Sequence, residues 1–281
     1  MRPGTALQID STIALDHGGR MPLFGLGTFR SPAGRETRAA VGWALEAGYR
    51  LVDTAALYGN EADVGAAIRA SGVPREDVFV TTKLHKDDHG YESTLRAFDE
   101  SLARLGFEYV DLYLIHWPES SRRQKSWDAM ERIREEGRAR AIGVSNYMVP
   151  HLEEVLEQGN VVPAVNQIEL HPFNYRSRLD VVELCGARGI VIEGYSPLTK
   201  TEKLDDPTVV EIATARGRTP AQVLIRWSLH HGVVTIPKST NRDRIRENAC
   251  VFDFELSSDD MLRLDALDED FLTSWDPRNV D

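Results

Sequence analysis

Short apolar runs alternate with longer helical patterns along most of the chain, and this alternation is the first indication of the fold. The apolar runs are rich in β-branched residues and predict strands at residues 23–26, 50–53, 78–82, 110–115, 140–144, 164–168, 189–194 and 233–236. Between these runs, apolar residues recur at the spacing of one helix face, as at Ala40, Trp43, Ala44 and Ala47. The pattern therefore predicts strands and helices in regular alternation.

The predicted strands are of a type that is buried on both faces. The run Val110–Ile115 is apolar at nearly every position, which is typical of a parallel sheet and not of a half-exposed antiparallel one. No Pro/Gly-rich linker, repeat or low-complexity segment interrupts the alternation. We therefore expect a single domain, residues 1–281, with the α/β fold of a (β/α)8 TIM barrel. An open doubly wound sheet is the alternative.

Two segments fall outside the eightfold scheme. Residues 7–15 predict an N-terminal β-hairpin around Asp10-Ser11, placed at the bottom of the barrel. Residues 258–267 predict an additional C-terminal helix, opened by Ser257 with Asp260 three residues later, which is the spacing of a capping box.

Charge and composition narrow the class of protein. The chain of 281 residues has 44 acidic and 33 basic residues and a net charge of -11. An acidic balance disfavours general binding to nucleic acid or to an anionic membrane, because both need a basic surface to meet phosphate. Any bound phosphate must therefore be held by a local cluster of basic residues.

We expect a soluble, cytoplasmic protein. No stretch approaches the roughly 20 apolar residues that span a bilayer, and the first residues show no basic segment leading into an apolar run, so no signal peptide is predicted. Cys185 and Cys250 lack any disulfide or ligand spacing, and His85 and His89 lack a third ligand, so no metal site is predicted. A monomer is expected, because no long apolar stripe is left uncovered.

Polar residues stand where the predicted strands stop. In a barrel of this kind the chemistry lies at the carboxyl ends of the strands. The residues at these ends are Asp53, Lys83, His116, Ser145-Asn146, Asn166-Gln167, Tyr195-Ser196 and Lys238-Ser239. Any one of them is also typical of a solvated loop, but their recurrence at seven strand ends predicts a site.

Four residues form a group with a chemical logic: Asp53, Tyr58, Lys83 and His116. A phenol has an ordinary pKa of about 10, so Tyr58 can donate a proton near neutrality only if its anion is stabilised, and the Lys83 ammonium is expected to do this. Asp53 would hold the ammonium, and His116 would orient a substrate oxygen. The alternative is a structural ion pair between Asp53 and Lys83, with Tyr58 and His116 in packing roles.

At these residues the sequence resembles the aldo-keto reductase superfamily. The segment Gly48–Ala55 continues through Tyr58-Gly59-Asn60-Glu61 to Gly65, and the segments Ala141–Tyr147 and Ile236–Thr240, the latter followed by Arg244 and Glu247-Asn248, complete three motifs in the order of the family. Within the superfamily the chain looks most like the bacterial 2,5-diketo-D-gluconate reductase type.

The resemblance implies NADPH-dependent reduction of aldehydes and ketones. Carried over by position, Tyr58 is the general acid, Lys83 and Asp53 tune it, and His116 orients the carbonyl. The implied cofactor residues are Thr28, Ser145, Asn146, Gln167, Tyr195, Ser196, Leu198, Lys238, Ser239, Arg244, Glu247 and Asn248. A 2′-phosphate needs fixed cations, and Lys238 with Arg244 would supply them.

The implied substrate pocket departs from the family at one position. Phe29 and Trp117 match pocket-lining positions, and apolar walls with few polar groups suit a small carbonyl compound. His85 stands where relatives often have tryptophan, which predicts a smaller and more polar wall. The molecule that the protein binds and converts is thus expected to be a small carbonyl substrate.

Two other functions stay open. A barrel lyase or aldolase would use Lys83 as a Schiff-base amine, since a lysine at a strand end suits that chemistry. A nucleotide sensor would bind the cofactor with little turnover. The complete group of Asp53, Tyr58, Lys83 and His116 favours the reductase.

Overall fold

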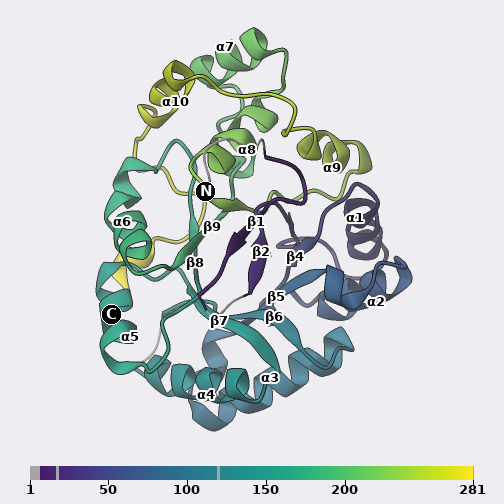
Figure 1. The fold of residues 1–281 in the computed structure, drawn as a ribbon, viewed down its shortest axis with the longest axis vertical. Coiled ribbons are helices and arrows are strands. Elements are labelled where there is room, and N and C mark those ends of the chain that lie inside the picture. The colour runs from purple at the N-terminus through teal and green to yellow at the C-terminus, as the bar shows by residue number, and fades with distance from the viewer. Residues whose placement is uncertain (1–6, 17–18, 119–120, 281) are drawn as a thin grey trace.

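Eight parallel strands form the central sheet of the computed structural model, which describes residues 7–16, 19–118 and 121–280. The strands are β3 Leu26–Gly27, β4 Leu51–Asp53, β5 Phe79–Leu84, β6 Val110–Ile115, β7 Ala139–Ser145, β8 Val165–Glu169, β9 Val191–Tyr195 and β10 Val234–Thr235. The sheet closes on itself, since Phe24 pairs in parallel with Thr235 and the Gly25 amide donates to the Thr235 carbonyl at 3.0 Å. The fold is the predicted (β/α)8 barrel (Figure 1).

Helices surround the strands on the outside of the barrel (Figure 1). They are α1 Arg35–Glu46, α2 Glu61–Ala70, α3 Tyr91–Leu105, α4 Arg123–Glu135, α5 Val149–Gln158, α6 Leu179–Ala187, α7 Pro207–Arg216, α8 Pro220–His230, α9 Arg242–Ala249 and α10 Ser258–Asp265. Both α7 and α8 follow β9, and α7 packs against α10. One connection of the barrel therefore holds two helices.

The predicted C-terminal helix is present as α10. The Asp260 amide donates to Ser257 Oγ at 3.2 Å, and the Ser257 amide donates to Asp260 Oδ2 at 2.8 Å. This reciprocal pair is the predicted capping box, which satisfies two of the backbone N–H groups at the helix start.

The N-terminal hairpin is present, but the sequence prediction misplaced its turn. Strands β1 Thr12–Ala14 and β2 Arg20–Pro22 pair in antiparallel fashion. Asp10-Ser11 instead form a separate turn before β1, in which the Gln8 amide donates to Ser11 Oγ at 2.8 Å. The prediction of a hairpin within residues 7–15 was wrong in position, because Asp and Ser suit a side-chain-capped turn as well as a hairpin turn.

The N-terminal segment lies at the amino ends of the strands. A side-chain carbon added to Gly48, just before β4, would come 3.3 Å from Ile9 Cδ1, and one added to Gly189, just before β9, would come 3.1 Å from Asp16 Oδ2. The opposite end of the barrel is therefore left open.

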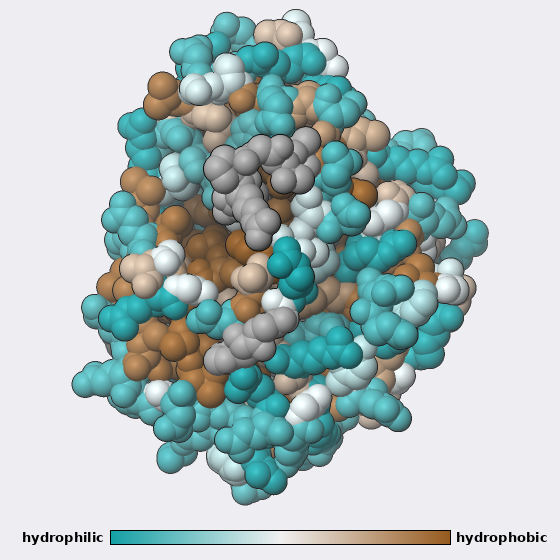
Figure 2. Space-filling model, in the orientation of Figure 1, coloured by the Kyte–Doolittle hydropathy of each residue, from teal (hydrophilic) through white to brown (hydrophobic). Residues whose placement is uncertain are grey.

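On the face that carries this segment, the surface is mainly hydrophilic, with apolar areas beside it (Figure 2).

The register of the sheet determines which polar side chains share the barrel interior. Gln167 in β8 is paired with Glu193 in β9, and Asp53 in β4 is paired with Thr81 in β5. Partners in a parallel sheet point to the same face, and every second residue of a strand shares that face, so Lys83 follows Thr81 into the interior. The interior is therefore polar near the carboxyl ends of β4, β5, β8 and β9.

Candidate active site

A cavity of about 920 Å³ opens at the carboxyl ends of the strands. Most residues predicted from the sequence line it, namely Phe29, Asp53, Tyr58, His116, Trp117, Ser145, Asn146, Gln167, Tyr195, Ser196, Leu198, Lys238, Ser239, Arg244, Glu247 and Asn248. The structure thus brings together, in one cavity, residues that are far apart along the chain. We call Asp53, Tyr58, Lys83 and His116 the tetrad end of the cavity, and Lys238, Ser239 and Arg244 its cationic end.

Lys83 lies beneath the cavity and is fully buried, and its ammonium group donates hydrogen bonds on all sides. Its Nζ donates to Asp53 Oδ2 at 2.6 Å and Oδ1 at 2.7 Å, to the Thr54 carbonyl at 2.9 Å and to the Tyr58 hydroxyl at 3.3 Å. Such a buried charge is tolerated only with a close partner of opposite charge, which Asp53 provides. Lys83 therefore connects the buried carboxylate to the phenol that faces the cavity.

Tyr58 sits at the end of a short 3-10 helix, Ala56–Tyr58, directly after β4. Gly59 follows with a left-handed φ of 66°, which lets the chain turn away into α2. The Tyr58 ring packs 5.1 Å from the Phe29 ring and nearly perpendicular to the His116 ring at 5.6 Å. These contacts fix the phenol over Lys83.

The pKa of Tyr58 is raised well above its ordinary value of 10.0, first by burial and then by the charges of Asp53 and Glu193. The sequence predicts that Lys83 lowers this pKa. Lys83 is closer to the Asp53 carboxylate than to the phenol, so its charge is already balanced. Tyr58 is consequently a phenol at neutral pH, which is the form that can donate a proton.

His116 is held by its backbone from two sides. Its amide donates to the Leu84 carbonyl at 3.2 Å, and its carbonyl accepts from Asn146 Nδ2 at 2.9 Å. Burial, followed by the charges of Lys83 and His85, lowers the pKa of His116 well below its ordinary value of 6.5. The imidazole is therefore neutral. Its N–H group can donate a hydrogen bond, but it does not carry the additional proton that an acid would transfer.

Asn146, Ser145 and Tyr195 form a second hydrogen-bonded group in the cavity. The Tyr195 hydroxyl donates to Asn146 Oδ1 at 2.8 Å, and Ser145 Oγ donates to the Gln167 carbonyl at 2.8 Å. Asn146 has a left-handed φ of 64°, a conformation that asparagine adopts more readily than most residues. This group presents fixed amide and hydroxyl atoms beside the tetrad end.

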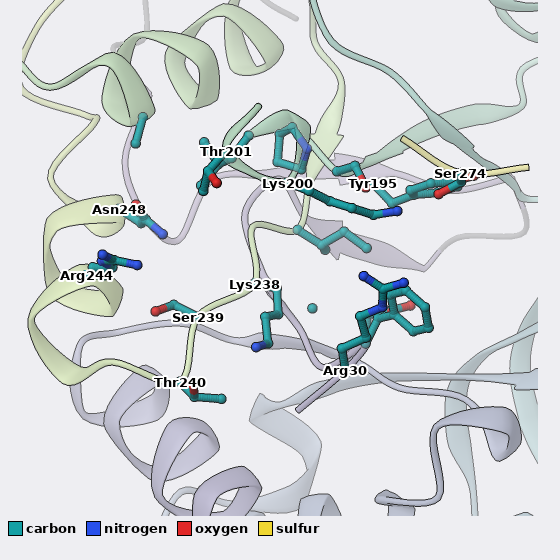
Figure 3. A pocket seen from close by; sticks show the side chains of 18 of the residues that line it. Arg30, Tyr195, Lys200, Thr201, Lys238, Ser239, Thr240, Arg244, Asn248 and Ser274 are labelled. Atoms are coloured by element: carbon teal, nitrogen blue, oxygen red, sulfur yellow. The ribbon is translucent and has the colours of Figure 1, made fainter. Parts of the chain in front are cut away.

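At the cationic end, Arg244 and Ser239 lie on the side of the cavity away from Tyr195, and Lys238 lies between them and Tyr195 (Figure 3). Asn241 caps α9, accepting from the amides of Asp243 and Arg244 at 3.0 Å each, and so sets Arg244 in the first turn of the helix. Within the part of the chain that the structure describes, neither Lys238 nor Arg244 forms an ion pair. Two unpaired cations at one cavity wall favour an anionic ligand.

Besides Lys83, two predicted site residues do not line the cavity. Thr28 is buried, and its Oγ1 donates to the Asp53 carbonyl at 2.8 Å, so it supports β4. His85 turns its Nδ1 toward Asp87, whose amide donates to it at 3.3 Å. The sequence position indicated a wall of the pocket, but the side chain is drawn into this local turn.

The C-terminal tail lies over the rim of the site. The Thr273 amide and Oγ1 donate to Glu169 Oε1 at 2.7 and 2.6 Å, and the Ser274 amide donates to Glu169 Oε2 at 3.1 Å. The Trp275 ring packs 5.0 Å from the Trp117 ring. Glu169 was not assigned to the site from the sequence.

Glu193 is a further residue of the site that was not predicted from the sequence. It is completely buried in β9, an otherwise apolar or small run, Val191–Tyr195, and it accepts from Gln167 Nε2 at 2.8 Å. A lone carboxyl group in such a strand was a visible signal, because a buried charge is rare without a partner.

The closed sheet, and the cavity at the carboxyl ends of its strands, define the class of (β/α)8 barrel proteins whose site lies at that end. The chain belongs to the aldo/keto reductase family, whose sequence pattern it matches over residues 23–269.

Its relatives agree with this assignment. The chain is 47% identical to glyoxal reductase of Bacillus subtilis, over 93% of this chain and 94% of that protein. It is 49% identical to morphine 6-dehydrogenase of Pseudomonas putida, over 96% and 95% respectively. A solved structure of an aldo/keto reductase from Brucella melitensis superposes with a TM-score of 0.89 at 43% identity, covering 94% of this chain and 100% of that chain. The chain is therefore an oxidoreductase of the aldo-keto reductase type.

No helix among the described residues has the length and apolar character needed to cross a membrane.

Proposed function

We propose that this protein is an NADPH-dependent reductase of small aldehydes, ketones or α-dicarbonyls, with Tyr58 as the general acid. The observation that carries the proposal is the layout of a single cavity, with a phenol above a buried ammonium at one end and the unpaired Lys238 and Arg244 at the other. Hydride transfer from a phosphorylated dinucleotide to a carbonyl needs a proton donor and a phosphate-binding cluster at such positions.

The residues of the cavity fit NADPH. Although the chain has a net charge of -11, Lys238 and Arg244 give the cavity a local positive end suited to a 2′-phosphate. The other cavity residues that would hold the cofactor are Ser145, Asn146, Gln167, Tyr195, Ser196, Leu198, Ser239, Glu247 and Asn248. Bound NADPH would supply a hydride to the carbonyl carbon.

The tetrad residues supply the proton and the orientation. Tyr58 donates its hydroxyl proton to the carbonyl oxygen as negative charge develops there. Lys83 Nζ, 3.3 Å from the same hydroxyl, donates a hydrogen bond to the phenolate oxygen that is left. The neutral His116 donates a hydrogen bond to the substrate oxygen and orients it.

The walls around Tyr58 favour a small, largely apolar substrate. Phe29 and Trp117 line the cavity beside the tetrad. Relatives named for glyoxal and for morphine are similar to this chain at nearly the same identity, so kinship alone does not select the substrate. We propose that the protein is a monomer in the cytoplasm. The two free cysteines, Cys185 and Cys250, are compatible with the reducing conditions of that compartment.

The contacts of Lys83 argue against the Schiff-base lyase. A lysine nucleophile needs a neutral amine that reaches the substrate, whereas Lys83 is fully buried and donates to Asp53, Thr54 and Tyr58.

The test is NADPH consumption with methylglyoxal, benzaldehyde and 2,5-diketo-D-gluconate, for wild type, Tyr58→Phe and the exposed control Tyr91→Phe. We expect turnover by wild type and the control, and a loss of about 10²- to 10⁴-fold in Tyr58→Phe with unchanged NADPH binding. Binding without turnover by wild type would favour the sensor. Absence of NADPH binding would refute the proposal.

A further inference from the structure

A second carboxyl group lies behind the tetrad in the barrel interior. Gln167 Nε2 donates to Asp53 Oδ2 at 2.9 Å and to Glu193 Oε2 at 2.8 Å. One side-chain amide thus joins the carboxylate that holds Lys83 to a buried carboxyl to which the proposed reaction gives no role.

The double contact sets the orientation of the Gln167 side chain. An amide nitrogen carries two hydrogens, and both are directed at carboxyl oxygens here. The side-chain oxygen is then the atom of Gln167 left to accept a hydrogen bond from a ligand in the cavity that Gln167 lines. Glu193 therefore helps to determine which end of the amide meets the ligand.

Glu193 holds a proton at neutral pH. Burial raises its pKa to about 8, the charge of Asp53 adds to the rise, and Gln167 and Lys83 act in the opposite direction. The ionisable groups that face it are Asp53 from β4, Lys83 from β5 and Tyr58 from the short helix after β4. Its register partner in β10 is the apolar Val234.

We propose that Glu193 is a positioning residue of this site: in its neutral form it holds Gln167 and Asp53 in place, and its ionisation slows proton donation by Tyr58. The second part rests on the proposed function. With Glu193 neutral, the interior holds one carboxylate against one ammonium. Ionised Glu193 adds a negative charge that increases the proton affinity of Tyr58 and so weakens it as an acid.

The first test is the pH profile of Glu193→Gln. This variant keeps the size of the side chain and an oxygen that can accept from Gln167, but it cannot ionise. In wild type we expect kcat for reduction to fall up to about tenfold between pH 7 and pH 9, because about a tenth of Glu193 is protonated one unit above its pKa. The variant is expected to stay within about twofold of wild type at pH 7 and to lose this fall. Identical profiles would overturn the proposal.

The second test needs no turnover. Because the folded protein favours the neutral form of Glu193, its contribution to stability is fully present below the ordinary pKa of 4.5 and is lost as pH rises through about 8. The Tm of the wild-type protein is therefore expected to fall relative to that of Glu193→Gln between pH 5 and pH 9. The surface variant Glu135→Gln serves as the control, since the Glu135 side chain is 68% exposed.

The two tests separate the inference from the proposed function. If the Tm difference appears but no carbonyl is reduced, Glu193 is the buried neutral group described here and the proposed function fails. If wild type reduces carbonyls but the Tm difference is absent, the inference fails and the proposed function stands.

Discussion

The two ends of the cavity handle charge in opposite ways. At the tetrad end, Asp53 and Lys83 are buried and paired with each other. At the cationic end, Lys238 and Arg244 are exposed, and neither has an ion-pair partner in the described part of the chain. A buried ion pair keeps its geometry, but each charge is already balanced by its partner. Exposed cations without an ion-pair partner can instead bind a charged ligand. We therefore propose that one end performs the chemistry and that the other provides binding energy.

This difference also predicts different sensitivities. Breaking a buried pair leaves a charge in a site that water does not reach, so the fold itself should suffer. Losing an exposed cation leaves the fold intact and weakens only a ligand that carries phosphate.

The largest effect on stability is expected from Lys83→Met. This change leaves the Asp53 carboxylate buried without its ammonium, and we expect the free energy of unfolding to fall by about 3–5 kcal/mol. Denaturant unfolding measures it, with Lys125→Met as the control, since the Lys125 side chain is 70% exposed.

The double variant Asp53→Asn/Lys83→Met sharpens the result. With both charges removed, much of the lost stability should return, although activity should not. A double variant no more stable than Lys83→Met alone would mean that the unpaired charge was not the cause.

The next effect concerns Arg244→Ala. Loss of a charged hydrogen-bond donor costs about 1.5–3 kcal/mol, so the Kd for NADPH should rise about 10- to 100-fold. Binding of NADH, which lacks the 2′-phosphate, should not change, and the Tm should stay within about 1 °C of wild type. Fluorescence titration with both cofactors measures this. Equal weakening of both cofactors would contradict a 2′-phosphate contact.

The smallest effect is expected at the rim, in Trp275→Ala. The Trp275 ring packs against Trp117, and an aromatic pair of this kind contributes about 0.5–1.5 kcal/mol. We expect the KM for benzaldehyde to rise about 2- to 10-fold with no change in NADPH affinity. Leu262→Ala, at an exposed position of α10, is the matched control. A change in NADPH affinity instead would place Trp275 at the cofactor.

The barrel was predictable because its determinants are local. Apolar runs and helical spacing are properties of short segments, and the capping box at Ser257 and Asp260 is a contact between residues three apart. The tetrad was predictable because the carboxyl ends of parallel strands meet at one end of a barrel.

Other features depend on contacts that short segments do not contain. The Gln167 amide reaches Asp53 across 114 positions in sequence, and Thr273 reaches Glu169 across 104. The sequence marks Glu193 as a lone carboxyl group in its strand, but its connection to Asp53 through Gln167 is a long-range contact. His85 shows the converse, since its position indicated the pocket and its side chain turned to Asp87.

The most direct test of the division between the two ends compares wild type, Tyr58→Phe and Arg244→Ala in single-turnover reduction of a carbonyl and in NADPH titration. Tyr58→Phe should lower the rate of reduction at saturating NADPH by about 10²- to 10⁴-fold and leave the Kd unchanged. Arg244→Ala should raise the Kd and leave the saturated rate unchanged. A Tyr58→Phe variant that reduces carbonyls at the wild-type rate would contradict the account.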